Sequence, residues 1–164
     1  MVIGIMSDSH GRADRVRDAC ALFDKLGAEL LIHCGDVGGT DVLDELVGRA
    51  CTFVWGNMDS PDHATRAYVD SVGLPWPEQS PVSIAVAGKR LLVFHGHEPG
   101  IMDRAWTLDA DYAFHGHTHE CRDERFGDLR IINPGALTRA ARYTVATLDL
   151  TTDELTFHEI PSER

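Results

Sequence analysis

The first half of the chain alternates short apolar runs with amphipathic stretches. Three apolar runs are too short for helices and predict buried strands: Val2–Met6, Glu29–Cys34 and Cys51–Trp55. Apolar residues at helical spacing predict three helices: Arg12–Leu26, Thr40 to about Gly48, and a weaker one from Ser60-Pro61 to about Ser71. Strands that alternate with helices indicate a parallel α/β arrangement.

The pattern changes after Gly73–Pro81, a proline-rich stretch without periodicity that we interpret as a loop. Six further apolar runs predict strands: Val82–Ala87, Leu91–His95, Ala110–His115, Leu129–Ile132, Tyr143–Leu150 and Glu154–Ile160. Hairpin turns are expected at 88–90 and 151–153, and a short helix near Met102–Leu108. A parallel half followed by an antiparallel half predicts an α/β fold, with two mixed β-sheets packed face to face and helices outside. We expect a single domain over residues 1–164.

The charge balance restricts the binding partners. Acidic residues outnumber basic residues 26 to 15, and the formal net charge of −11 disfavours long nucleic acid and anionic membranes. No apolar stretch approaches the ~20 residues of a membrane span, and the first residues lack the basic region of a secretory signal. The four cysteines form no CxxC pair, which suits free thiols in a reducing compartment, so we expect a cytoplasmic protein.

Polar residues follow most of the predicted strands, at the position where layered α/β folds bind ligands. The oxygen and nitrogen donors among them number seven: Asp8, His10, Asp36, Asn57, His95, His117 and His119. Seven ligands exceed one tetrahedral site and predict two ions that share a carboxylate. Ligands of these types favour Mn, Fe, Zn, Ni or Co, and such ions supply the positive field that an acidic chain needs to bind phosphate.

Each motif taken alone has an ordinary structural explanation. Asp8 can cap a helix, and Asp36 and Asn57 can be turn residues. Three histidines within five residues, from His115 to His119, are harder to explain in this way, although a pH switch would be one alternative. We interpret His115 itself as a packing or orienting residue, and His33 as a core residue or one that supports a ligand.

The five motifs occur in one order along the chain. They are Asp8-Ser9-His10, Gly35-Asp36, Gly56-Asn57, His95 and Gly116-His117-Thr118-His119. In these residues the chain resembles the calcineurin-like metallophosphoesterases, and its short length and Asn133-Pro134-Gly135-Ala136 resemble the small prokaryotic phosphodiesterase branch. The resemblance implies a two-sheet sandwich flanked by helices, and a homodimer or higher oligomer is plausible by the same resemblance.

The resemblance also implies how the ligands divide between two ions. One ion would be held by Asp8, His10, Asp36 and His119, and the other by Asp36, Asn57, His95 and His117, with Asp36 bridging. Manganese is our first expectation for the metal. A bridging water activated by both ions would attack phosphorus in a small phosphodiester, such as a cyclic nucleotide or a nucleotide derivative.

One position departs from the family pattern. Many superfamily members carry histidine after the Gly-Asn motif, where this chain has Met58, so we expect esters with good leaving groups to be preferred. His97 is the candidate catalytic substitute because it shares a face with His95. Besides the ions, we expect Asn57, Met58 and His10 to contact substrate. Four arginines are candidates for binding the phosphate of the substrate: Arg12, Arg104, Arg122 and Arg139. Three segments would shape the mouth: Met58–Pro81, Glu98–Asp109 and Glu120–Asp128.

Two other functions remain open at this stage. The same fold serves as a non-catalytic scaffold in the retromer complex, and a phosphomonoesterase would use the same ligands. All seven ligand residues are present, which disfavours the scaffold, because scaffold members have changed some ligand positions. A nuclease acting on long nucleic acid is disfavoured by the net charge of −11.

Overall fold

The computed structural model describes residues 1–105, 107 and 109–161 and contains two five-stranded mixed sheets. The first sheet has the order β10-β9-β1-β2-β3. Its strands are β1 (Val2–Met6), β2 (Ala28–His33), β3 (Cys51–Phe53), β9 (Tyr143–Asp149) and β10 (Glu154–Ile160). β1, β2 and β3 are parallel, whereas β9 is antiparallel to both β1 and β10.

The second sheet has the order β4-β5-β6-β8-β7. Its strands are β4 (Val82–Val86), β5 (Lys89–Val93), β6 (Tyr112–Phe114), β7 (Cys121–Phe126) and β8 (Leu129–Pro134). β5, β6 and β8 are parallel, and the two edge strands β4 and β7 pair antiparallel to them. Each sheet therefore combines a parallel centre with antiparallel strands.

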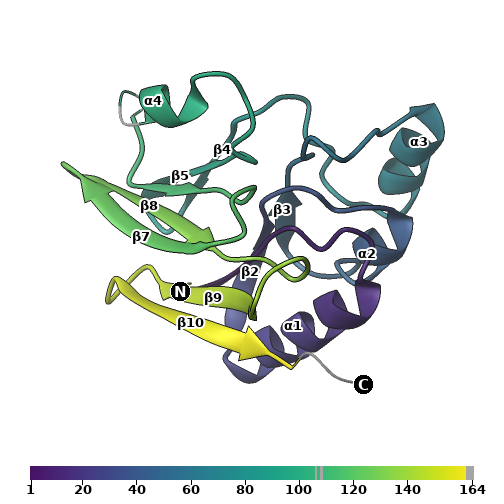
Figure 1. Ribbon diagram of the computed structural model, residues 1–164, viewed down its shortest axis with the longest axis horizontal. Helices are drawn as coiled ribbons and strands as arrows, with labels where there is room; N and C mark the ends of the chain where they lie inside the picture. Colours follow the sequence, from purple (N-terminus) through teal and green to yellow (C-terminus); the bar gives the residue numbers. More distant parts are fainter. Residues whose placement is uncertain (106, 108, 162–164) are drawn as a thin grey trace.

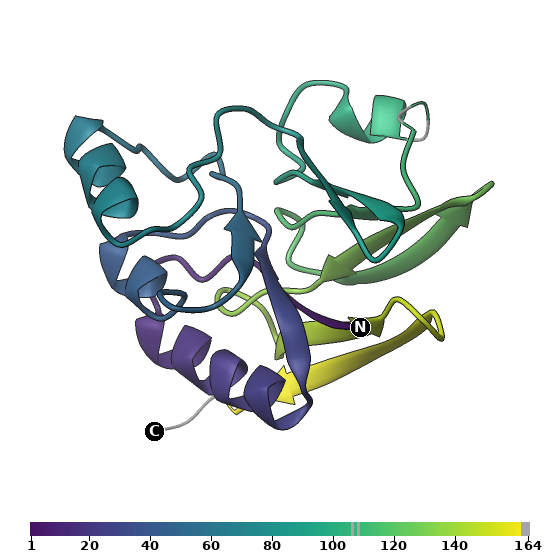
Figure 2. The same ribbon diagram turned by 180° about the vertical axis from the view of Figure 1, so that it is seen from behind.

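The described helices lie outside the two sheets. They are α1 (Ala13–Lys25), α2 (Thr40–Asp44), α3 (His63–Ser71) and α4 (Ile101–Ala105). Figure 1 shows α1, α2 and α3 beside the first sheet and α4 beside the second, and Figure 2 shows the same layers from behind. Helix–sheet–sheet–helix layering confirms the predicted α/β fold with two mixed sheets.

Period-two alternation along the strands builds a core on each side of the first sheet. In β1, Ile3 and Ile5 point toward the second sheet and join Val93 and Phe114 in the core between the sheets. Met6, on the other face, packs in the core beneath the helices. A smaller cluster beneath α4 closes the outer face of the second sheet. Apolar packing thus holds the strand ends in fixed positions relative to one another.

The division into a parallel and an antiparallel half is wrong in two respects. Strands β5, β6 and β8, which all come from the second half, are parallel to one another. The β9–β10 hairpin belongs to the first sheet, where β9 pairs with β1, although it comes last in the chain. Glu120–Asp128 was expected at the mouth and no strand was predicted there, but Cys121–Phe126 is the edge strand β7. The strand has no apolar pattern that would predict it, because β7 is an exposed edge strand that pairs with β8 and is rich in charged residues.

Smaller differences concern the ends of elements. The third helix begins at His63 because the Asp62 carboxylate accepts a hydrogen bond from the Thr65 amide at 2.8 Å and caps the helix there. The first hairpin turns at Ala87-Gly88, both with positive φ, so β5 begins two residues earlier than expected. The helix expected near Met102–Leu108 corresponds to α4, and residues 106 and 108 lie outside the described residues.

Candidate metal centre

The carboxyl ends of the parallel strands from both sheets meet at one edge of the sandwich. The segment after β1 is hydrogen-bonded to the segment after β2, with the Asp8 amide 3.0 Å from the Gly35 carbonyl and the His10 amide 2.9 Å from the Asp36 carbonyl. The segments after β5 and β6 are linked in the same way, through the Gly116 amide and the His95 carbonyl at 3.0 Å. All seven donor residues predicted from the sequence lie on these segments or on the one after β3.

The backbone at this edge is strained. Five of the seven donor residues have positive φ, a conformation that is uncommon outside glycine: Asp8 (54°), His10 (44°), Asp36 (53°), His117 (69°) and His119 (61°). Such conformations cost free energy and persist where surrounding structure enforces them, often at functional sites. The fold therefore aims these side chains at one region at the expense of local backbone stability.

Two glycines allow carboxylates to approach the backbone closely. A Cβ atom on Gly116 would lie 1.9 Å from Ser7 Oγ and 2.5 Å from Asp8 Oδ2. A Cβ atom on Gly56 would lie 2.1 Å from Asp36 Oδ1. At both positions, in the Gly-Asn and Gly-His motifs, a larger residue would overlap the neighbouring carboxylate, so glycine is required.

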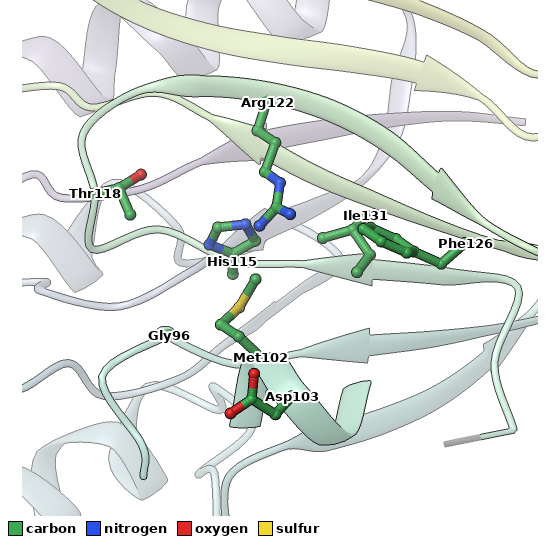
Figure 3. A pocket seen from close by; sticks show the side chains of 8 residues that line it. All are labelled: Gly96, Met102, Asp103, His115, Thr118, Arg122, Phe126 and Ile131. Atoms are coloured by element: carbon green, nitrogen blue, oxygen red, sulfur yellow. The ribbon is translucent and has the colours of Figure 1, made fainter. Parts of the chain in front are cut away.

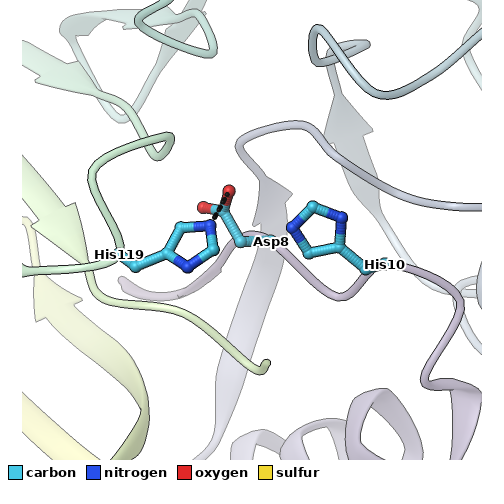
Figure 4. Close-up of side chains that lie close together, drawn as sticks. All are labelled: Asp8, His10 and His119. Atoms are coloured by element: carbon cyan, nitrogen blue, oxygen red, sulfur yellow. Dashed lines mark ion pairs between the residues drawn. The ribbon is translucent and has the colours of Figure 1, made fainter. Parts of the chain in front are cut away.

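A first group of donor atoms comprises Asp8, His10 and His119, whose ligand atoms all lie within 4.8 Å of one another (Figure 4). His119 Nε2 is 3.1 Å from Asp8 Oδ1. The other ring nitrogen of His119, Nδ1, is 3.3 Å from the Arg139 carbonyl and donates its proton there. The lone pair of Nε2 consequently faces a carboxylate oxygen, an arrangement that requires a cation or a proton between them.

A second group comprises Asp8, Asp36 and His95. His95 Nδ1 donates to the Cys34 carbonyl at 2.8 Å, so His95 Nε2 also turns a lone pair toward oxygen atoms. Those oxygens are Asp36 Oδ2 at 3.4 Å and Asn57 Oδ1 at 3.1 Å. Asp36 Oδ2 is also 3.6 Å from His10 Nε2, so this one carboxylate lies between the two groups.

The electrostatics favour an ionised carboxylate at Asp36. Burial raises the pKa of this carboxyl, but hydrogen bonds with His95 and the Met58 amide outweigh burial and lower the pKa to about 2. Burial lowers the pKa of His95, yet the contacts with Asp36 and the Cys34 carbonyl produce a net rise. A buried carboxylate that draws positive charge onto a neighbouring imidazole is a site suited to a cation.

The remaining predicted residues lie around these groups. The His117 amide donates to Asp8 Oδ2 at 3.1 Å, and its ring packs edge-on against His95 with centroids 5.1 Å apart, although neither three-residue group within the described chain includes His117. The ring of His97 is tilted by 54° against that of His95, with centroids 5.4 Å apart, and the His97 side chain is 33% exposed. Met58 is 59% exposed, and its amide donates to Asp36 Oδ1 at 2.9 Å.

Two polar residues outside the predicted donor set, Asp59 and Asn133, hold the donor segments together. The Asp59 carboxylate accepts hydrogen bonds from the amides of Val37, Gly38 and Gly56 at 2.8–3.0 Å. The Asn133 amide group donates to the Gly116 carbonyl at 2.9 Å and accepts from the Gly135 amide at 2.9 Å. Asp59 directly follows the Gly-Asn-Met motif, and this spacing was the only signal in the sequence that could have indicated its role.

His33 has the supporting role that was one of its two predicted interpretations. Its Nε2 atom is 2.8 Å from Ser9 Oγ, which itself donates to the Val37 carbonyl at 3.0 Å, so His33 Nε2 is the donor. His33 Nδ1 then accepts from the Gly35 amide at 3.3 Å. Burial lowers the pKa of His33 to about 4, which keeps the ring neutral in this role. His33 therefore joins the segments that carry His10 and Asp36.

The donor set fits divalent metal ions. Among the described residues, six buried side-chain atoms have no hydrogen-bond partner, and Asp8 Oδ1 and His10 Nε2 are two of them. The distances of 3.1–3.6 Å between these nitrogen and oxygen atoms are those expected between two ligand atoms of one ion, each bonded to it at about 2.1 Å. Orphaned buried atoms and lone pairs facing oxygen are both explained by cations at this edge.

His115 lies on the outer face of the second sheet, away from both three-residue groups. It lines a pocket of about 350 Å³ between α4 and β7, where Arg122 and Met102 approach it from opposite sides (Figure 3). Its ring stacks parallel to Phe94, and Nδ1 is 3.0 Å from the Gly116 carbonyl. The position agrees with a packing and orienting residue.

The sequence model of the calcineurin-like phosphoesterase superfamily domain matches residues 1–153. The chain therefore belongs to this superfamily of metal-dependent hydrolases of phosphoester bonds. It is 28% identical over 138 residues to phosphodiesterase MJ0936 of Methanocaldococcus jannaschii, covering 82% of this chain and 83% of the relative. A solved archaeal phosphodiesterase structure, 26% identical, superposes with a TM-score of 0.85 over 98% of this chain and all of the other.

A further solved structure shares the fold alone. Vps29 of Entamoeba histolytica, solved with zinc, is 20% identical and has a TM-score of 0.67 over 97% of this chain and 91% of the other. Within the described part of the chain, no helix has both the length and the apolar character to cross a bilayer.

Proposed function

We propose that this protein hydrolyses small phosphodiesters at a centre of two divalent metal ions. One observation carries the proposal: the Asp36 carboxylate lies between His10 and His95, 3.6 Å and 3.4 Å from their Nε2 atoms, within a buried donor cluster. When bound, the ions supply the positive charge that activates a water molecule and stabilises the phosphoryl oxygens. Manganese is the metal we expect first, with Ni, Fe, Zn or Co as alternatives.

The chain's own residues divide into ligands and residues that orient them. We assign Asp8, His10, Asp36 and His119 to one ion, and Asp36, Asn57, His95 and His117 to the other. The carbonyls of Cys34 and Arg139 hold the rings of His95 and His119 so that each Nε2 points inward. His10 and Asn57 also border the position of the reacting phosphate.

The substrate is a small diester with a good leaving group. The net charge of −11 disfavours long polyanions, and Met58 offers no proton to a departing alkoxide. His97 is our candidate for that proton transfer, because its ring lies 5.4 Å from that of His95 and 6.3 Å from that of His117. Its side chain remains open to solvent and can reach a bound ligand.

The test of the proposed function is hydrolysis of a chromogenic phosphodiester and the matching monoester by metal-stripped protein. Mn, Ni, Zn and Mg are added back one at a time. We expect diester hydrolysis that requires a transition metal. A clear monoester preference would still support the metal centre, but it would contradict the diester with a good leaving group that we infer from Met58. Metal binding without hydrolysis of either ester would favour a non-catalytic interaction module.

The role of His97 is tested separately. We expect His97→Ala to lower kcat about 100-fold, the low end for loss of a general acid, with two ions still bound. His63→Ala, at an exposed histidine that begins α3, is the matched control and should change neither quantity. Loss of metal together with activity in His97→Ala would make His97 a ligand instead.

Three further assignments belong to the same proposal. We propose that residues 1–164 act as one domain, that the protein works in the cytoplasm, and that it forms a homodimer or higher oligomer. The four cysteines are free, which suits a reducing compartment. A monomer in sedimentation experiments at working concentration would contradict the proposed oligomer.

A further inference from the structure

Most of the cationic side chains that the structure describes already have a partner. Most arginines pair with a carboxylate, as Arg12 does with Asp14 and Arg122 with Glu124, and Arg15 and Arg104 donate to backbone carbonyls. Among the described residues, three cationic side chains form neither an ion pair nor a hydrogen bond: Lys25, Arg139 and Arg142. Two of these three lie together beside the metal centre.

Arg139 and Arg142 line one pocket of about 400 Å³ that also includes the donor residue His119. Between the two arginines stand Ala140 and Ala141, whose small side chains leave the pocket open. One carboxylate, that of Glu120, contributes to the lining. Two unpaired guanidinium groups against one carboxylate make the pocket a cationic site on a chain of net charge −11.

The backbone of Arg139 is held firmly while its side chain is free. Just before it, the Leu137 amide donates to the Ser7 carbonyl at 3.1 Å, and Thr138 Oγ1 donates to the Asp8 carbonyl at 3.0 Å. The Arg139 carbonyl accepts from His119 Nδ1, and Arg139 has a positive φ of 52°. The Cα atom of Arg139 is thus fixed between the segments that carry Asp8 and His119, and its guanidinium extends from a rigid base.

We propose that this pocket binds a second phosphate group of the substrate, so that the preferred substrates are phosphodiesters with a further phosphate beyond the scissile one. Guanidinium groups bind phosphate through paired, charge-assisted hydrogen bonds. The metal ions neutralise the reacting phosphate, whereas a second phosphate near this surface would be repelled unless separate cations receive it. The inference rests on the proposed function and specifies the substrate class for the same centre.

The test uses two substrates that differ in one phosphate. These are the p-nitrophenyl ester of thymidine 5′-phosphate and the same ester with an added 3′-phosphate. For the manganese-loaded protein we expect kcat/KM to be about tenfold higher for the bisphosphate, the effect of one charge-assisted contact. The preference should fall as ionic strength rises, because both arginines are exposed.

The variants are chosen to preserve the fold. Arg139→Asn places a residue that tolerates positive φ at position 139, and Arg142→Gln removes the second charge. We expect the double variant to lose the tenfold preference. Arg142→Gln alone, at a residue that contacts no predicted metal ligand, should lose part of the preference, hydrolyse the simple ester within about twofold of wild type and keep its metal content. Lys25→Ala is the matched control, since it removes an unpaired charge at the far end of α1, about 18 Å from the helix start.

A binding measurement distinguishes failure of this inference from failure of the proposed function. Calorimetry compares thymidine 3′,5′-bisphosphate with thymidine 5′-phosphate on manganese-loaded protein and needs no turnover. Tighter binding of the bisphosphate that the double variant abolishes supports the pocket, even if neither ester is hydrolysed. Equal binding and equal kcat/KM for the two members of each pair would overturn it. An equal loss on both esters in Arg139→Asn would place Arg139 on the reacting phosphate and also overturn it.

Discussion

Clusters of charged side chains lie at both ends of the parallel strands of the second sheet, and the two clusters differ in how their charges are balanced. At the start of the strands, the Arg130 side chain is 8% exposed and donates to both carboxylate oxygens of Asp123, at 2.7 and 2.9 Å. It also donates to Asp153 Oδ1 at 2.6 Å, and the Tyr112 hydroxyl donates to the same oxygen at 2.9 Å. This cluster joins the second sheet to the β9–β10 turn and is balanced by its own residues.

The cluster after the ends of the strands is not balanced internally. Asp8 and Asp36 meet histidines whose Nε2 lone pairs face oxygen, and Asp8 Oδ1 has no hydrogen-bond donor. The same protein thus contains a charged cluster built for stability and another that requires an added cation. The difference shows that unsatisfied buried atoms, rather than buried charge as such, indicate a ligand site.

The largest expected effect follows removal of the shared carboxylate. Asp36→Asn keeps the shape of the side chain but removes the charge between His10 and His95, so both ions should bind more weakly. We expect diester hydrolysis to fall more than about 100-fold, because even loss of a residue that only supports a ligand costs 10–100-fold. Metal analysis and kcat/KM measure the effect, and retention of two ions with full activity would contradict the bridging role.

Acid should weaken the metal edge before it weakens the Arg130 cluster. Burial lowers the pKa of His33 to about 4, so the unfolded chain takes up a proton near pH 6.5 while the folded chain does not. His33 alone should therefore lower the free energy of unfolding of metal-free protein by about 3 kcal/mol as the pH drops from 6.5 to 4.

The Arg130 cluster also loses stability as the pH falls, but at lower pH than the metal edge. The hydrogen bond from Arg130 lowers the pKa of Asp123, so its contribution is complete above about pH 4 and is lost only below that value. Denaturant titrations at several pH values, with His33→Gln as control, measure both effects. An unchanged slope between pH 6.5 and 4 in His33→Gln would exclude His33 as the source.

Removal of Arg130 should affect stability alone. Arg130→Met leaves Asp123 without its cation and Asp153 with Arg125 alone, and we expect a loss of about 2 kcal/mol, below the value for fully buried pairs because both carboxylates are about 40% exposed. Urea unfolding measures the loss. Metal content and kcat/KM should stay at wild-type values, and a fall in either would show that the two ends of the strands are coupled.

The smallest effect is expected where one hydroxyl joins two donor segments. Ser9→Ala removes the acceptor of His33 Nε2 and the donor to Val37, so His10 should lose part of its support. We expect metal affinity to fall about tenfold with modest loss of stability. Ser71→Ala, which removes a hydroxyl contact on the exposed helix α3, is the control and should leave metal affinity unchanged.

The fold was largely predictable because its core strands are apolar and short. Val2–Met6 and Glu154–Ile160 were predicted with their observed ends, since both are bounded by clear turn or motif residues. Cys121–Phe126 was missed because an edge strand with both faces exposed carries no hydrophobic alternation. The place of the last hairpin beside β1 was also missed, because strand order depends on contacts distant in sequence.

The amino-acid sequence by itself determined which residue types follow each strand, and hence the seven donors and the family. Spacing along the chain is enough for this, because parallel strands bring their ends to one edge. Only the tertiary structure decided which nitrogen of each histidine faces inward, that Asp36 lies between His10 and His95, and that Arg139 and Arg142 are unpaired beside His119. These features depend on hydrogen bonds between segments far apart in sequence, such as that from His119 to the Arg139 carbonyl, which no local pattern records.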